Sequence, residues 1–296
     1  MRKSIRYSQN FLKDKRLIQE LVDNSSLAQN DVVFEIGSGK GIITEVLASH
    51  CKNVVAIESD PRLVNNLRTK FQHYQNVQVQ SANILAYNLP NYEYKVFSNI
   101  PFNITADIIR KLIYAHTPPN DCYLIIQREA ALKFAGTVSK ETLFSVLNKP
   151  WYEFSITHQF SSSDFIPEPN VSIVLLRIQK RKEALITNDQ KQIYKNFVAF
   201  TFNRSIPNLK KGLQNIFSST QYSIISRELH QNDNVTPTQL TFEQWLGIFN
   251  SFTKLVDHRK QQVIIGAEAK IIKDASKIDK VHRTRVSKNW RQEGIF

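Results

Sequence analysis

The tetrapeptide Asn99-Ile100-Pro101-Phe102 brings together an amide oxygen, a main-chain carbonyl, a rigid ring and a flat aromatic face. The Asn99 amide oxygen and the Ile100 carbonyl can each accept one N–H of an adenine exocyclic amine, whose lone pair is otherwise delocalised into the ring. Pro101 has a fixed φ that stiffens the turn, and Phe102 can stack on a flipped-out base. These residues suit attack of the amine on a sulfonium methyl group. The alternative is a plain strand-to-turn junction with a buried aromatic side chain.

A glycine-rich segment, Glu35–Gly41, supplies the second set of candidate residues, and we call it the glycine loop. A phosphate-binding P-loop requires Ser or Thr after Gly-Lys, whereas another glycine follows Gly39-Lys40. A dinucleotide fingerprint requires Gly or Ala at the position that Ile42 occupies. The remaining interpretation is a turn in which Gly37 and Gly39 let an adenosyl ligand approach the backbone closely. A tight turn without a ligand is the alternative.

Two polar residues at the ends of the next apolar segments extend this interpretation. Glu58 ends the segment 54–58, and its carboxylate can accept hydrogen bonds from the ribose hydroxyls of an adenosyl ligand. Asn83 follows the segment 77–80, and its side-chain oxygen can accept a hydrogen bond from the adenine amine of that ligand. A solvated acid at a strand end and a turn-forming asparagine are the alternative interpretations.

Short apolar segments alternate with helical segments through the first 180 residues, which predicts an α/β fold with a mostly parallel sheet covered on both faces. Seven segments are expected to be strands: 32–36, 54–58, 77–80, 95–100, 123–127, 156–160 and 172–178. The last two have a short connection, so we expect them to pair as an antiparallel hairpin. Ligands gather at the carboxyl ends of strands in such sheets, so the tetrapeptide should face the same ligand as the glycine loop.

Charge and pattern change beyond residue 178. We expect three parts: a domain over 1–178 that carries the candidate site, a small all-α domain over 179–257, and a basic tail over 258–296. The first part holds 19 basic and 16 acidic residues, the second 10 basic and 6 acidic, and the third 10 basic and 4 acidic. The formal net charge of the whole chain is +13. The first 16 residues alone hold six basic residues against Asp14. This surplus suggests that these N-terminal residues, the helical domain and the tail hold a polyanion, although a solubilising surface is the alternative.

Several functional classes are disfavoured by composition. Cys51 and Cys122 cannot alone form a disulfide framework or a four-ligand zinc site, and the seven histidines show no ligand spacing, so we expect no metal. The N-terminus lacks the apolar run of a signal peptide, and no stretch approaches a membrane span. A cytoplasmic protein without membrane contact is expected.

Five stretches, in order, resemble the Erm family of ribosomal RNA adenine N6-methyltransferases, within a wider group that includes small-subunit rRNA adenine dimethyltransferases. They are Gln9–Leu12, the glycine loop, Ala56–Glu58, Ser98–Asn103 and Phe165–Val171. The resemblance covers residues 9–171, and the helical domain is similar in outline. Lys40 and Ile100 favour Erm, because the small-subunit group more often has Leu at the latter position.

The resemblance implies a Rossmann-like SAM-dependent methyltransferase fold, with S-adenosylmethionine (SAM) as methyl donor, S-adenosylhomocysteine as product and no metal. It implies that the part over 1–178 binds SAM and is catalytic, and that the part over 179–257 binds RNA. The implied substrate is one adenine of 23S rRNA, whose methylation gives resistance to macrolide, lincosamide and streptogramin B drugs. A monomer is expected.

The resemblance also assigns roles by position. The implied cofactor-binding residues are Asn10, Leu12, Gly37, Gly39, Glu58, Asn83 and Asn99. The implied catalytic residues are Asn99, Ile100, Pro101 and Phe102. The family usually has Asp at position 83 and often Tyr at position 102, so Asn83 lacks a charge and Phe102 lacks a hydroxyl. Ile173 replaces a usual Ser and is interpreted as a packing residue.

Alternatives stay open for two segments and for the function. Gln9–Leu12 either packs on the domain as an arm or forms a lid over cofactor or RNA. Phe165–Val171, extended by its prolines, either shapes the target-base pocket or simply connects two strands. The rival functions are a small-subunit (16S) rRNA adenine dimethyltransferase in ribosome assembly and a non-catalytic nucleic-acid-binding factor on the same fold.

Overall fold

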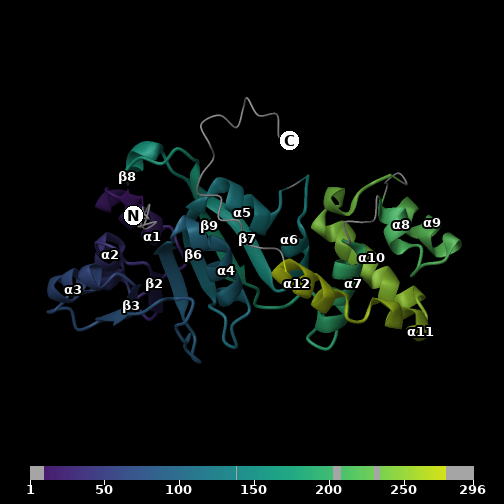
Figure 1. The fold of residues 1–296 in the computed structure, drawn as a ribbon, viewed down its shortest axis with the longest axis horizontal. Coiled ribbons are helices and arrows are strands. Elements are labelled where there is room, and N and C mark those ends of the chain that lie inside the picture. Colours follow the sequence, from purple (N-terminus) through teal and green to yellow (C-terminus); the bar gives the residue numbers. More distant parts are fainter. Residues whose placement is uncertain (1–9, 138, 203–207, 230–233, 278–296) are drawn as a thin grey trace.

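The computed structural model describes residues 10–137, 139–202, 208–229 and 234–277. Its centre is a seven-stranded sheet in the order β4-β3-β2-β5-β6-β9-β7 (Figure 1). The strands are β2 (Val32–Ile36), β3 (Asn53–Glu58), β4 (Val77–Ser81), β5 (Lys95–Asn99), β6 (Asp121–Gln127), β7 (Tyr152–Gln159) and β9 (Ile173–Lys180). Strands β2 to β6 run parallel, whereas β9 is antiparallel to both β6 and β7. The predicted α/β fold, including the antiparallel final strand, is confirmed.

The order of the strands creates a switch point beside β2. The chain leaves β2 through β3 to β4 at one edge, and then returns to β5 on the other side of β2. Val33 of β2 pairs with Lys95 of β5 in parallel register, so the two strands end at the same edge of the sheet. The glycine loop follows β2 and the tetrapeptide follows β5, so the topology alone brings the two motifs together.

Both faces of the sheet are covered. Leu124 of β6 enters one hydrophobic cluster, and its neighbour Ile125 enters another on the opposite face. This explains the apolar run Cys122–Ile126 of β6, whereas the edge strands β4 and β7 include polar residues. The covering helices are α4 (Thr105–Ile113) and α5 (Arg128–Ala135) on the first face, and α1 (Lys15–Asp23) and α2 (Ile42–His50) on the second.

After β9, the described residues form helices only: α7 (Lys191–Thr201), α8 (Leu209–Leu213), α9 (Ser219–Glu228), α10 (Phe242–Leu255), α11 (His258–Gln261) and α12 (Ala267–Lys277), with short 3₁₀ turns. The first hydrophobic cluster continues into this region, and the Tyr194 hydroxyl donates to the Val146 carbonyl of α6 (Leu143–Asn148) at 2.8 Å. The division at residue 178 therefore stays a proposal, because one core joins both parts. No helix of the described chain is long and apolar enough to cross a membrane.

The first part of the basic tail is helical and packs against the helical region. Glu268 of α12 pairs with Lys195 at 3.2 Å and accepts a hydrogen bond from Gln192 at 2.9 Å. The Glu268 N–H donates to the Asn196 side chain at 3.2 Å. Residues 278–296 lie outside the described residues, so RNA contact by the tail stays a prediction.

A two-stranded sheet joins segments that are far apart in the sequence. β1 (Phe11–Leu12) pairs antiparallel with β8 (Phe165–Ile166), and the Lys13 N–H donates to the Asp164 carbonyl at 3.1 Å. Figure 1 shows β8 above α2, beside the purple start of the described chain. The stretches Gln9–Leu12 and Phe165–Val171, which are separate motifs in the sequence, are thus paired through these strands.

Candidate active site

The glycine loop depends on backbone conformations that favour glycine. Gly37, Gly39 and Gly41 have φ values of 74°, 56° and 74°, in the left-handed region. The N–H groups of Gly37 and Ser38 donate to the Ile57 carbonyl at 2.8 and 3.2 Å, which ties the loop to the end of β3. The turn is therefore tight, and three of its positions carry no side chain.

The N-terminal arm, residues 10–13, covers this loop. A Cβ atom added to Gly39 would lie 2.7 Å from Cε1 of Phe11, so the ring rests directly on the loop. The Lys40 ammonium lies 5.3 Å from the centre of the same ring. Phe11 was not among the predicted site residues, although its stretch was. The arrangement favours the interpretation of this segment as a lid.

Glu58 lies inside the protein, with only 2% of its surface exposed. Its Oε2 accepts the Gly39 N–H at 2.9 Å, and its Oε1 accepts the N–H groups of Ser59 and Asp60 at 2.7 and 2.9 Å. The alternative of a solvated strand-end acid is therefore wrong. The Ser59 hydroxyl also lies 3.5 Å from Oε1, whereas Oε2 has the Gly39 N–H as its one donor among the described residues, so an acceptor position on Oε2 is left for a ligand hydroxyl.

A second buried acid, Glu35, lies at the start of the glycine loop and is 1% exposed. Burial raises its pKa to about 8, against the opposing effect of hydrogen bonds from Thr44 and Ser38, and the nearby Glu58 raises it further. Glu35 was not predicted as a site residue. The signal that marks it is an acid inside the otherwise apolar segment 32–36.

The tetrapeptide begins at the last residue of β5. The Asn99 Nδ2 donates to the main-chain carbonyl of Asn10 at 2.7 Å. A carbonyl can only accept, so this bond commits the amino group of Asn99 and leaves its Oδ1 as the open acceptor. In the described chain nothing donates to this Oδ1. Pro101, at φ −60° and ψ 127°, turns the chain into the 3₁₀ helix Phe102–Ile104.

The structure brings six of the predicted residues into one small cleft. Its lining consists of Asn10, Phe11, Gly37, Asn99, Ile100, Pro101 and Phe102. The Ile100 side chain itself is buried in the core, so its main chain is the part available to a substrate. The cleft, of about 20 Å³, joins the glycine loop, the arm and the tetrapeptide, and the roles of these residues in binding and catalysis stay predictions.

Other predicted residues lie outside this cleft lining. Leu12 is 4% exposed and packs in the core, so only its main chain could meet a cofactor. Asn83 is exposed, and its Oδ1 accepts the Leu85 N–H at 3.0 Å, as a turn-forming asparagine does. A second lone pair of that oxygen stays available. Their cofactor contacts remain predictions, as do those of Gly39 and Glu58. Within the described ranges, no cluster of three His, Cys, Asp or Glu side chains could hold a metal ion.

The sheet order and the glycine loop at its switch point define a Rossmann-like fold. The family model described as ribosomal RNA adenine dimethylase matches residues 1–254. The chain belongs to this family. The predicted identity as an rRNA adenine methyltransferase is thereby confirmed.

Individual relatives support the same family assignment. An rRNA adenine N-6-methyltransferase of Limosilactobacillus reuteri is 34% identical over 252 residues, which cover 85% of this chain and 97% of the relative. One of Bacillus licheniformis is 28% identical over 255 residues, 85% of this chain and 88% of the relative. Among solved structures, the 23S rRNA methyltransferase ErmE has a TM-score of 0.78 at 25% identity, covering 83% of this chain and 100% of that one. A dimethyladenosine transferase of Plasmodium falciparum, with a TM-score of 0.62 at 19% identity over 90% of this chain and 98% of that one, shares the fold.

The buried Glu35 predicts a pH-dependent stability. Between pH 4.5 and about 8, Glu35 is protonated in the folded chain and ionised in the unfolded chain. Its contribution to the free energy of unfolding should therefore fall as pH rises through this window, by up to about 1.4 kcal/mol per pH unit. Glu35→Gln removes this titrating group. In urea unfolding at pH 5.5, 6.5 and 7.5, the free energy of unfolding of the variant should therefore rise relative to that of the wild type as pH increases. If the difference in free energy of unfolding between the two proteins were the same at all three pH values, the prediction would be wrong.

Proposed function

We propose that this protein transfers a methyl group from SAM to N6 of one adenine in 23S rRNA. The observation that carries the proposal is the open Asn99 Oδ1, held in the same cleft as Gly37 by the bond from Asn99 Nδ2 to the Asn10 carbonyl. A positioned amide oxygen beside a glycine-rich turn suits an amine substrate next to an adenosyl cofactor. The proposed substrate would place the reaction in the cytoplasm, and we propose that the protein acts there as a monomer.

The residues present fit SAM. Gly37 lines the cleft at the end of β2 without a side chain, and the buried Glu58 keeps an acceptor position on Oε2 for a ribose hydroxyl. We assign the adenine amine of the cofactor to Asn83, and flanking contacts to Asn10 and to the main chain of Leu12. When bound, SAM would supply an electrophilic methyl group on a sulfonium sulfur.

The tetrapeptide prepares the substrate amine. Asn99 Oδ1 and the Ile100 carbonyl each accept one N–H, which draws the nitrogen toward tetrahedral geometry and frees its lone pair. Phe102 offers a face on which the flipped-out adenine stacks. A strong general base is unnecessary, because the amine becomes acidic once methylated and loses its proton to water.

The choice of 23S over 16S rRNA is supported by Lys40 and Ile100, which follow the Erm pattern, and by the similarity to ErmE. Methylation of 23S rRNA would give resistance to macrolide, lincosamide and streptogramin B drugs.

The direct test is incubation with labelled SAM and either protein-free 23S rRNA or immature 30S particles, followed by primer extension. We expect label in 23S rRNA only, with a single extension stop if the adenine is dimethylated and none if it is monomethylated. Label confined to the 30S particle would establish the 16S alternative instead. No label together with no SAM binding by isothermal titration would point to a non-catalytic factor.

Asn99→Ala removes the acceptor that activates the amine. We expect kcat to fall roughly a hundredfold or more, with SAM affinity mostly retained. Asn65→Ala, an exposed asparagine on α3 (Pro61–Lys70), is the matched control and should leave both quantities unchanged. Wild-type turnover by the Asn99 variant would show that the mechanism is wrong.

Phe102→Leu removes the stacking face while keeping an apolar side chain. The loss of roughly 1–3 kcal/mol of stacking should lower kcat/KM for RNA by about 5- to 150-fold. Phe102→Tyr keeps the ring and should lose less. Because Phe102 also packs against the core, the thermal midpoint of each variant is compared with that of the wild type. Equal kcat/KM values for the Leu variant and the wild type would count against stacking.

A further inference from the structure

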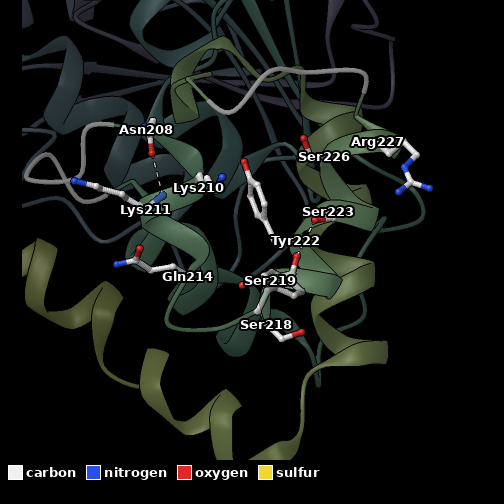
Figure 2. Close-up of a pocket in the computed structure, with 11 residues that line it drawn as sticks. Asn208, Lys210, Lys211, Gln214, Ser218, Ser219, Tyr222, Ser223, Ser226 and Arg227 are labelled. Atoms are coloured by element: carbon white, nitrogen blue, oxygen red, sulfur yellow. Dashed lines mark hydrogen bonds between the residues drawn. The ribbon is translucent and has the colours of Figure 1, made fainter.

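The candidate active-site cleft is narrow, so the spacing of its walls decides what it can hold. Its volume is about 20 Å³, against about 860 Å³ for a polar cleft between α8 and α9, at the end of the molecule remote from β1 and β8 (Figure 1, Figure 2). Two of its walls are the turn at Gly37 and the tetrapeptide that begins at Asn99, which follow the neighbouring strands β2 and β5. The contacts that set the distance between these strand ends therefore bear on the reaction.

The pairing between β2 and β5 stops before the two strands end. Its last matched pair is Phe34 and Val96. On their other sides the strands stay paired to their ends, β2 with β3 up to Ile36 and β5 with β6 up to Asn99. The two central strands therefore diverge at their carboxyl ends, which is where a ligand binds in a sheet of this kind.

The Ser98 hydroxyl bridges this gap. The Ile36 N–H donates to Ser98 Oγ at 2.8 Å, so a side chain takes the place of the strand pairing. Ser98 is fully buried inside the apolar strand β5, and Ile36 is 2% exposed, so water is kept away from the bond. Without the hydroxyl, the buried N–H would lose this acceptor at a point where water cannot replace it.

The bond joins the two residues that directly precede predicted site residues. Ile36 comes before Gly37, and Ser98 comes before Asn99. Gly37 is also tied to β3, because its N–H donates to the Ile57 carbonyl at 2.8 Å. Asn99 is also held by its pairing with β6 and by its side-chain bond to the arm. Those contacts fix each residue on its own side, whereas the Ser98 bond crosses from one side to the other.

We propose that Ser98 is a positioning residue for methyl transfer. Its hydroxyl fixes the distance between the turn at Gly37, beside the methyl donor, and Asn99 Oδ1, which orients the amine. Ser98 is buried behind the cleft lining and acts through Asn99. The inference rests on the proposed function only in giving Asn99 this role, and it applies to whichever rRNA carries the adenine. A misplacement of about 1 Å between reacting groups costs roughly a hundredfold in rate, so one bond at this point matters.

The test is the Ser98→Ala variant, which removes the acceptor with little change in volume. We expect kcat to fall roughly tenfold or more, while the SAM affinity and the KM for RNA stay within about twofold of the wild-type values. Turnover is measured on the rRNA that the wild type labels, well below the thermal midpoint of the variant. A bond that only stabilised the sheet would lower that midpoint and leave kcat unchanged, and this result would overturn the proposal.

Amide hydrogen exchange reports the bond without any turnover. The Ile36 N–H should exchange faster in Ser98→Ala than in the wild type, because its buried acceptor is gone. Equal exchange rates would show that the bond does not form in solution, and the proposal would be wrong.

Two further variants separate positioning from stability. Ser98→Thr keeps the hydroxyl and should restore most of kcat, so a folded Thr variant as slow as Ser98→Ala would contradict the proposal. If the added methyl group prevents folding, the decision falls to the Ala variants. Val54→Ala is the matched control, because Val54 is fully buried on β3 and does not line the cleft. Its thermal midpoint should fall while kcat stays at the wild-type value.

The double variant Ser98→Ala/Asn99→Ala tests whether Ser98 acts through Asn99. If it does, removing the hydroxyl from the Asn99→Ala protein should lower kcat no further. A further loss as large as that caused by Ser98→Ala alone would show that Ser98 acts by another route, and the proposal would fail.

This proposal and the proposed target fail in different experiments. If the wild type labels 16S rRNA in 30S particles instead of 23S rRNA, the proposed target is wrong, and the Ser98 variants are then compared on those particles. If the wild type labels 23S rRNA and Ser98→Ala labels it with the same kcat, the target stands and the positioning role is wrong.

Discussion

The hydrogen bond from Asn99 Nδ2 to the Asn10 carbonyl links the end of a central strand to the N-terminal arm. An amide side chain has one donor end and one acceptor end, and this bond decides which of them faces the cleft. The same arm is pinned by its pairing with β8, and its Phe11 ring rests on Gly39. The direction of one amide group therefore depends on three segments: the arm, β5 and β8.

Two buried acids organise the glycine loop in different ways. Glu58 gathers three backbone N–H groups and so shapes the turn between β3 and α3 as well as the loop itself. Glu35 lies close by in a setting that favours its protonated form. A neutral Glu35 avoids the repulsion that two adjacent buried carboxylates would otherwise create. The loop can thus hold a carboxylate for a ligand without the cost of a second buried charge.

Much of the fold and part of the site could be predicted from the sequence. The central strands are covered on both faces and therefore appear as apolar runs, and glycines mark the turn after the first of them. The motif order placed Gly37 and Asn99 together through sheet topology alone. The pairing of Phe11 with Ile166 was beyond reach, since a two-residue strand carries no periodicity. The burial of Glu35 and the local hydrogen bond of Asn83 depend on tertiary surroundings that a single sequence does not record.

The pairing of β1 with β8 also has a consequence for biosynthesis. The arm is the first described segment to leave the ribosome, yet its partner lies more than 150 residues later in the chain. The nascent protein must therefore expose an unpaired N-terminal strand while the central sheet is being translated. The cleft reaches its final form only after Phe165 has emerged, so partly synthesised chains lack a completed active site.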